Sequence, residues 1–458
     1  MTKRIVGLIS LGLFTILAIM YFLHLQEIVE IPETVLVSFR WMFLTTMIMY
    51  AVYKRNLTTW ILVSMLIGIE IGLDFPVFSQ NLRVLSQIFL RLVKTIIAPI
   101  LFATLVVGIA GHSSLKQVGR MGWKSILYFE VVTTIALFIG LLAINISQAG
   151  KGILLPEGFV EKLPDVKPQG WQDVVLHIFP ENFVKSVYNG DVLPIVVFSI
   201  IFGIALAMLS EAKKRPMLDF TESLAETMFK FTNIVMYFAP FGVGAAIAVT
   251  VGHLGIDVLF NLLKLLATLY VALIAFILLV FLPVALIIKL PIKQFLRAAS
   301  EPVSIAFATT SSESALPIAM ENMEKFGVPR KIVSFVLPTG YTFNLDGTTL
   351  YLSLASVFVA QAAGLNMSFG EQVFMGLTLM LTSKGVAGVP RASLVILLGT
   401  AASFNLPLWP IMAILGIDEL MDMARTSVNV TGNMLASCVI ARWEGEFDDE
   451  KALAFQPD

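Results

Sequence analysis

A charged and polar segment near the C-terminus, Asp418–Asn433, reads DELMDMARTSVNVTGN within an otherwise apolar stretch, Pro407–Ile440. On a helix its most polar residues recur on one face: Asp418, Asp422, Arg425, Asn429 and Asn433. A guanidinium can hold a carboxylate through two parallel hydrogen bonds, and a neighbouring carboxylate can hold an ammonium. This face therefore has the chemistry to bind a zwitterion that carries an additional acid group.

The apolar stretch around this segment is long enough to cross a bilayer. A charged residue at the bilayer centre costs roughly 2.5–3.5 kcal/mol, so we expect the polar face to lie against protein or a water-filled cavity. An alternative interpretation is that Asp422 and Arg425 form an ion pair that only joins helices. Because ionisable groups within membranes usually mark functional sites, we predict a binding site.

The composition indicates a membrane protein. The chain has 458 residues, of which 57% are hydrophobic and 14% are charged, whereas soluble domains carry about 25% charged residues. A formal net charge of −1 without a basic tract argues against nucleic acid as a partner. The single cysteine, Cys438, excludes an internal disulfide, and the four histidines show no metal-ligand spacing. We predict an all-α polytopic membrane protein without a metal site or cofactor.

Hydropathy predicts eight simple spans before residue 290: Ile5–His24, Leu36–Tyr53, Thr58–Leu73, Val84–Ala110, Gly122–Ile146, Val192–Leu209, Phe229–Val251 and Val258–Ile288. The first could be a signal peptide, but no small-residue cleavage pattern follows, which favours a retained anchor. Lys and Arg gather on every second loop, so the N-terminus is predicted to be cytoplasmic. Gln148–Asp191 is predicted to be an external insertion, and the acidic tail from Arg442 a solvated end.

The apolar segments that follow are interrupted. Their breaks contain Ser, Gly or Pro and lie within three apolar segments: Thr309–Pro317 in Val303–Met320, Asn344–Thr349 in Ile332–Ala363, and Thr382–Ser393 in Phe374–Ala401. Backbone groups freed within a membrane need partners in protein or in a water-filled cavity. The first and third breaks therefore predict re-entrant hairpins. The predicted pattern is a hairpin followed by a broken helix, occurring twice, which is typical of transporters built from inverted repeats.

Four ordered motifs carry a family resemblance: SSESALP, PTGYTFNLDGTTLY, GVAGVP and DMARTSVNVTGN. They resemble the signature segments of the dicarboxylate/amino acid:cation symporter, or glutamate transporter, family, and in particular its bacterial proton-coupled glutamate/aspartate members. The resemblance covers about Thr58 to Gly445. Residues 1–55 have no counterpart in the usual core and are predicted to form two extra spans.

The resemblance implies a homotrimer in which one part of each protomer moves as an elevator. Residues 1–55 would form the extra transmembrane hairpin, and residues 56–290 mainly the scaffold, although the third and sixth core spans would join the moving part. Residues 291–441 would form the core of the transport domain, with two hairpins and the last two helices. Residues 442–458 would be a cytoplasmic tail.

The family also implies roles for individual side chains. Arg425 would bind the side-chain carboxylate of the substrate, and Asp422 its amino group. Asn429 and Ser312 would meet the main-chain carboxylate, while Thr348 would support the substrate side chain. Thr426 and Val389 complete the predicted substrate-binding set. Family branches that carry C4-dicarboxylates lack the aspartate at position 422, so its presence favours glutamate and aspartate.

The coupling ion is predicted from departures from sodium-driven members. Asn433 stands where they have a carboxylate, and Leu345 where they have a methionine; only Thr133 remains of a hydroxyl cluster. With Asn344 and Asp346 these residues form at most a degenerate cation site. We therefore predict proton coupling, with sodium as the alternative.

Apolar surroundings favour the neutral, proton-carrying form of a carboxyl group, and four carboxyl groups are candidate proton carriers: Glu130, Glu313, Asp346 and Asp422. Glu130 could equally be a hydrogen-bonding group between helices.

The predicted function is secondary active import of glutamate and aspartate with protons, across the inner membrane of a prokaryote. Sodium-coupled uptake of the same substrates, and proton-coupled uptake of fumarate, succinate or malate, remain alternatives. An intramembrane hydrolase would need a Ser–His or paired-Asp constellation, and Ser311 and Ser312 have no histidine near them in sequence. A channel would need rings of one side-chain type. The chain is therefore predicted not to be an enzyme.

Overall fold

The computed structural model describes residues 3–110, 115–153, 179–189, 192–383, 392–404 and 406–456, and these contain helices but no strand. The first helices are α1 (Lys3–Leu25), α2 (Glu33–Lys54), α3 (Leu57–Asp74), α4 (Pro76–Asn81), α5 (Arg83–Ala110), α6 (Leu115–Ser147), α8 (Phe183–Asn189), α9 (Val192–Ala207), α10 (Glu211–Met236) and α11 (Ala239–Leu254). The later ones are α12 (Asp257–Phe276), the π-helical turn η1 (Ile277–Phe281), α13 (Leu282–Ile287), α14 (Ile292–Thr309), α15 (Ser312–Lys325), α16 (Arg330–Phe343), α17 (Asp346–Ala362), α18 (Phe369–Ser383), α19 (Ala392–Ser403), α20 (Trp409–Leu415), α21 (Asp418–Glu444) and α22 (Asp449–Ala454).

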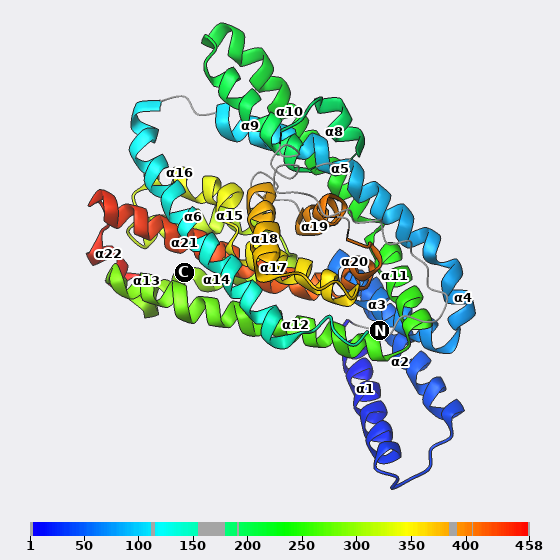
Figure 1. Cartoon of the computed structure of the whole chain (residues 1–458). Coiled ribbons are helices and arrows are strands. Elements are labelled where there is room, and N and C mark those ends of the chain that lie inside the picture. The colour runs from blue at the N-terminus through cyan, green and yellow to red at the C-terminus, as the bar shows by residue number, and fades with distance from the viewer. Residues whose placement is uncertain are drawn as a thin grey trace.

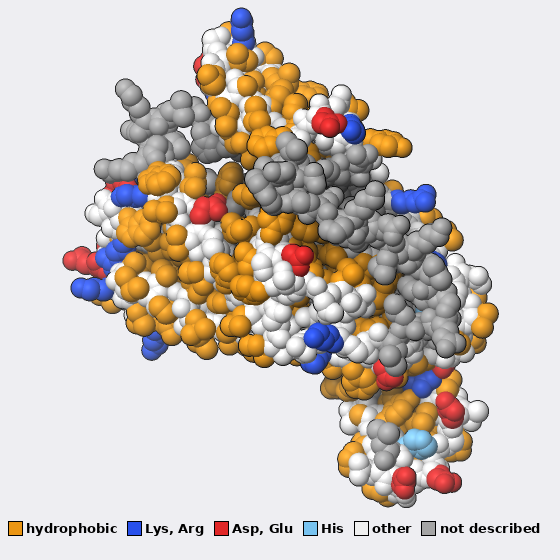
Figure 2. All heavy atoms as spheres, viewed as in Figure 1, with side chains coloured by type: hydrophobic (Ala, Val, Ile, Leu, Met, Phe, Trp, Pro, Cys, Tyr) orange, Lys and Arg blue, Asp and Glu red, His pale blue; other side chains and the backbone are white. Residues whose placement is uncertain are grey.

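The length and apolarity of these helices make this a multi-pass membrane protein. In the described ranges six helical segments are long and apolar enough to span a membrane, or seven if the bent pair α10–α11 is one span. Hydrophobic side chains spread over much of the face in Figure 2, and charged side chains are sparse among them. The predicted all-α polytopic class is confirmed.

Two predicted spans differ from the structure. The span Val192–Leu209 corresponds to α9, whose 16 residues reach about 24 Å, short of a hydrocarbon core of about 30 Å. The span Phe229–Val251 is broken between α10 and α11 by a bend of 51°. A proline at the start of α11 lacks the N–H that would continue the helix. Hydropathy averages predict neither the shortness of α9 nor the bend between α10 and α11.

The two N-terminal helices form a hairpin that projects from the rest of the molecule (Figure 1) and is fixed to the first core helix by charge. The Nε of Arg40 in α2 lies 2.8 Å from Glu70, and its Nη2 lies 2.6 Å from Asp74, both in α3. Arg40 also donates to the Tyr21 hydroxyl at 2.8 Å, and the Trp41 indole donates to Asp74 at 2.7 Å. The hairpin is thus held by a nearly buried ion cluster.

Substituting Arg40 by methionine is expected to detach this hairpin. It leaves Glu70 and Asp74, 13% and 14% exposed, without their cation. Breaking a buried pair from one side costs about 3 kcal/mol or more. The apparent melting temperature of the purified protein should therefore fall, while Arg83→Met, a change at an exposed arginine of α5, should leave it unchanged. Equal melting temperatures for the two variants would contradict the assigned role of Arg40.

The core helices pack in two groups. Helices α3, α4, α5, α9, α10 and α11 contact one another, while α6, α12 and the helices from α14 to α21 form the second group, which meets the first where α18, α19 and α20 contact α9, α5 and α11. Helix α21 runs through the second group and contacts α6, α12, α14, α15, α16 and α17 (Figure 1). The polar face of α21 is therefore enclosed by other helices of the same chain.

The interruptions lie where the sequence predicts them but are shorter. Helices α14 and α15 are separated only by Thr310, with a φ of 53°, and Ser311, whose side chain accepts from the Ser314 N–H. Pro317 lies inside α15, so the prediction that the helix is broken as far as Pro317 is wrong. Asn344 and Leu345 separate α16 from α17. The tip between α18 and α19, residues 384–391, lies outside the described ranges.

The predicted external insertion, Gln148–Asp191, contains the short helix α8. Residues 154–178 and 190–191 of this insertion are not among those that the structure describes.

The C-terminal tail is packed against the protein, contrary to the predicted solvated end. Ala452 and Phe455 are 0% and 5% exposed. The Asp448 N–H donates to the Gly327 carbonyl at 3.0 Å, and Arg442 Nη1 donates to Asp449 at 2.7 Å. Apolar side chains within the acidic run therefore decide its position.

Acid is expected to loosen this tail. Hydrogen bonds from Arg442 lower the pKa of Asp449, so the pair stabilises the docked tail above the ordinary carboxyl pKa, about 3.9, and is lost as the pH falls through the lowered value. Hydrogen exchange of residues 446–456 should rise by up to about fivefold in Asp449→Asn at neutral pH. Glu450→Gln, a change at an exposed neighbour, is the control. Equal exchange in both variants would contradict this role.

Candidate functional site

The polar face predicted for the last core helix is confirmed. In α21 the five side chains are nearly inaccessible: Asp418 0%, Asp422 5%, Arg425 1%, Asn429 4% and Asn433 0% exposed. Burying these charged and polar groups away from water costs free energy unless they have hydrogen-bond or ion-pair partners. The arrangement of those partners defines the site.

The guanidinium of Arg425 is held by two carboxylates of its own helix. Its Nε donates to Asp422 Oδ1 at 2.9 Å, and its two terminal nitrogens donate to Asp418 at 2.9 and 3.4 Å. Three of the five guanidinium N–H groups are thereby used. The other two donate no hydrogen bond to a carboxylate among the residues that the structure describes, and a substrate carboxylate can accept from both.

Asp422 is itself fixed from two sides. Besides the bond from Arg425, its Oδ1 accepts from the Thr426 hydroxyl at 2.9 Å. The ion pair with Arg425 lies within one helix, three residues apart. The alternative interpretation, in which this pair only joins two helices, therefore does not fit the geometry.

One residue of the site is missing from the sequence prediction. Tyr351 of α17 lies under Arg425, with the guanidinium carbon 4.1 Å from the ring centre, and its hydroxyl donates to Asp418 at 3.1 Å. The sequence predicts Asp418 on the polar face but assigns it no role. The signal for Tyr351 is its spacing of three residues from Thr348, which puts both on one face of α17.

The break before α17 brings its first turn against the middle of α21. The N–H groups of Gly347 and Thr348 donate to Asn429 Oδ1 at 2.8 and 3.3 Å, and Asn429 Nδ2 donates to Thr348 Oγ1 at 2.9 Å. A Cβ at Gly347 would lie 2.4 Å from the Arg425 carbonyl oxygen. Only glycine allows this approach, which places Thr348, Asn429 and Arg425 together as predicted.

Three residues of the predicted degenerate cation site also meet. Asn344 Nδ2 donates to Asn433 Oδ1 at 3.1 Å. The carboxylate of Asp346, 0% exposed, lies against α21, because a Cβ at Gly432 would stand 2.4 Å from its Oδ2. Leu345, which lies between Asn344 and Asp346 in the sequence, is also buried, with 9% of its surface exposed. Thr133, in α6, is back-bonded to the Phe129 carbonyl at 2.6 Å instead of to this cluster.

Other predicted residues are not brought into the site by the described contacts. Ser312, at the start of α15, is partly exposed and makes no side-chain hydrogen bond within the described ranges. Glu130 of α6 is only half-buried. Val389 and the side chain of Glu313 lie outside what the structure describes. No group of three His, Cys, Asp or Glu side chains that could hold a metal ion occurs in the described part of the chain.

Comparison with known proteins identifies the family. The model of the sodium:dicarboxylate symporter family matches residues 57–443. The chain is a member of the sodium:dicarboxylate symporter family. It is therefore a transporter and not an enzyme, and the residues before 57, with α1 and α2, lie outside the family match.

Relatives within this family carry informative names. The chain is 42% identical over 412 residues to the proton/sodium-glutamate symport protein of Bacillus caldotenax, with 88% of this chain and 98% of the relative covered. It is 42% identical over 420 residues to the proton/glutamate-aspartate symporter of Escherichia coli, with 88% and 96% covered. The C4-dicarboxylate transport protein of Bacillus subtilis is 39% identical over 408 residues, with 87% and 96% covered.

Proposed function

We propose that this protein is a symporter that imports glutamate and aspartate together with protons. The observation that carries this proposal is the buried guanidinium of Arg425, which keeps two N–H groups available beside a fixed carboxylate, Asp422. The N–H groups receive the side-chain carboxylate of the substrate, and Asp422 receives its ammonium group. The names of the relatives from Bacillus caldotenax and Escherichia coli support this substrate class.

Around this centre the other predicted contacts follow. Asn429 and Ser312 bind the main-chain carboxylate, Thr348 and Thr426 position the substrate and its partners, and Val389 closes the pocket from the second hairpin. Thr348 and Asn429 are hydrogen-bonded to each other at 2.9 Å, which supports their joint role. Ser312 reaches the substrate from the start of α15, a helix that packs against α21.

Protons are proposed as the coupling ion because Asn433 stands where sodium-driven members have a carboxylate. Its side chain is hydrogen-bonded to another neutral amide, that of Asn344. A glutamate anion entering a negative interior costs about 2.3 kcal/mol per 100 mV, so at least two protons make import electrically favourable. Asp346, Asp422, Glu130 and Glu313 are the proposed carriers. Sodium remains the second candidate, since Asp346 and Asn344 lie together and one relative is named for both ions.

The two groups of packed helices support an elevator with a homotrimeric scaffold. We assign α3, α4, α5, α9, α10 and α11 to the scaffold, and α6, α12 and the helices from α14 to α21 to the transport domain, with α14–α15 and α18–α19 as re-entrant hairpins of two inverted repeats. The N-terminus and the tail from residue 442 lie in the cytoplasm of a prokaryote.

Uptake into vesicles under separate gradients tests this function. With an alkaline interior and no sodium, labelled glutamate should accumulate, and an ionophore that collapses the pH gradient should abolish accumulation. Aspartate should compete more strongly than fumarate, since only aspartate has an ammonium group for Asp422. Full uptake at equal pH on both faces, together with its loss on removal of sodium, would contradict proton coupling.

A further inference from the structure

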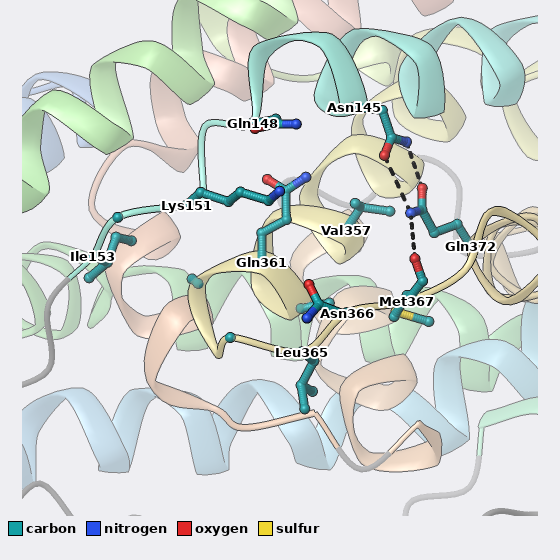
Figure 3. Close-up of a pocket in the computed structure, with 14 residues that line it drawn as sticks. Asn145, Gln148, Lys151, Ile153, Val357, Gln361, Leu365, Asn366, Met367 and Gln372 are labelled. Carbon is teal, nitrogen blue, oxygen red and sulfur yellow. Dashed lines mark hydrogen bonds between the residues drawn. The ribbon is translucent and has the colours of Figure 1, made fainter.

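A second polar cavity lies away from Arg425, where the C-terminal ends of α6 and α17 meet the start of α18 (Figure 3). Its volume is about 470 Å³, within the range of small-molecule sites, about 300–1,000 Å³. Its lining includes Asn145, Gln148, Lys151, Gln361 and Gln372. None of these residues belongs to the site on α21.

The loop that forms one wall is rigidly held. Gln148 has a φ of 48°, unusual for a residue with a side chain, and Asn261 of α12 donates to the carbonyls of Ala149 and Lys151 at 2.8 and 3.0 Å. The Gly150 N–H donates to Gln361 Oε1 at 3.2 Å, and a Cβ at Gly150 would lie 2.6 Å from a carbonyl of α17. The loop is therefore preorganised, and the position of the Lys151 backbone is fixed.

The opposite wall is made of paired amides. Gln372, only 7% exposed, accepts from Asn145 Nδ2 at 2.6 Å and donates to the Met367 carbonyl at 3.1 Å. The nearest acid in sequence, Glu371, faces away from this wall: its carboxylate accepts from the Ser368 N–H at 2.7 Å and closes the first turn of α18 as a capping box.

The charge on the described lining of the cavity is positive. Among the described residues that line the cavity, Lys151 is the only ionisable one, and its ammonium makes no ion pair with another described residue. The Lys151 side chain extends along the cavity toward Gln361 (Figure 3). Amide N–H groups and an ammonium all donate hydrogen bonds, so the cavity suits a small anion with several acceptor oxygens.

We propose that this cavity is a second binding site, for a small soluble carboxylate such as an acidic amino acid or a C4-dicarboxylate. Lys151 holds one carboxylate, and the amides of Gln148, Gln361 and Asn366 bind the remaining polar groups. A bound carboxylate would connect the loop after α6 to the first turn of α18. The site goes beyond the proposed transport function, because neither Arg425 nor the coupling ion takes part.

Equilibrium binding of labelled L-glutamate to purified protein in nanodiscs of neutral lipid tests the proposal. The central site is first disabled by Arg425→Ala. Weaker binding should persist in this variant and be displaced by succinate. Adding Lys151→Ala should weaken it about tenfold or more, whereas Lys230→Ala, at an exposed lysine of α10, should not. If Arg425→Ala does not fold, the wild-type isotherm should show two phases, of which Lys151→Ala removes only the weaker.

The outcomes are distinct. Absence of any binding in folded Arg425→Ala, or equal binding with and without Lys151, overturns the second site. Displacement by phosphatidylserine vesicles but not by succinate assigns the cavity to a lipid headgroup and overturns it too. Uptake by Lys151→Ala at trace glutamate concentration should equal that of the wild type, so a failure of the proposed transport function would appear separately.

Discussion

Substitution of Arg425 by alanine is expected to abolish glutamate and aspartate uptake. The guanidinium offers two N–H groups to the substrate carboxylate, and hydrogen bonds to charged groups contribute about 1.5–3 kcal/mol each. Losing both should weaken acidic substrates by more than about 100-fold. Neutral amino acids, which do not use these two N–H groups, should lose less. Binding and uptake of glutamate and serine by the same variant measure the difference.

The same substitution leaves Asp418 and Asp422 buried without a cation, which costs about 3–5 kcal/mol. A loss of uptake could then reflect unfolding, so the variant is combined with Asp418→Asn, which removes one uncompensated charge. Arg425→Lys is the charge-matched control: an ammonium cannot bind a carboxylate through a planar fork, and its affinity for glutamate should be intermediate. Unchanged glutamate affinity in a folded Arg425→Ala protein would contradict the site.

The sequence predicts the centre of this site well because its members lie on one helix. Regular spacing is enough to put Asp422, Arg425 and Asn429 on one face, and the cost of charge in a membrane is enough to bury them. Tyr351 is different, because its contact with Arg425 depends on how α17 crosses α21. That crossing depends on Gly347, which admits the Arg425 carbonyl at close range.

The features that sequence reasoning missed have a common physical origin. The 51° bend between α10 and α11 and the short break before α15 depend on local backbone geometry, to which hydropathy averages are insensitive. The docked tail depends on two apolar side chains, Ala452 and Phe455, within an acidic run whose charge suggests solvation. Composition thus predicts the class and the spans, while helix ends and tertiary contacts need the structure.

Substitution of Asp422 by asparagine is expected to change the substrate preference from acidic amino acids to dicarboxylates. The carboxylate is positioned by Arg425 and Thr426, both at 2.9 Å, and it is the proposed partner of the substrate ammonium. An amide keeps the shape and one acceptor oxygen but loses the charge. Glutamate affinity should fall by about 10- to 100-fold, as expected for a charged hydrogen bond.

Succinate and fumarate have no ammonium group, so the same change should leave their binding intact or improve it. It removes one of the two negative charges that neutralise Arg425, which strengthens the attraction of the guanidinium for a substrate carboxylate. Competition of succinate against labelled glutamate, in wild type and Asp422→Asn, measures the switch, and Thr426→Val serves as the control that disturbs the Asp422 contact without removing charge. If the affinities for glutamate and succinate fell to the same extent, Asp422 would hold Arg425 in place and would not bind the substrate amino group.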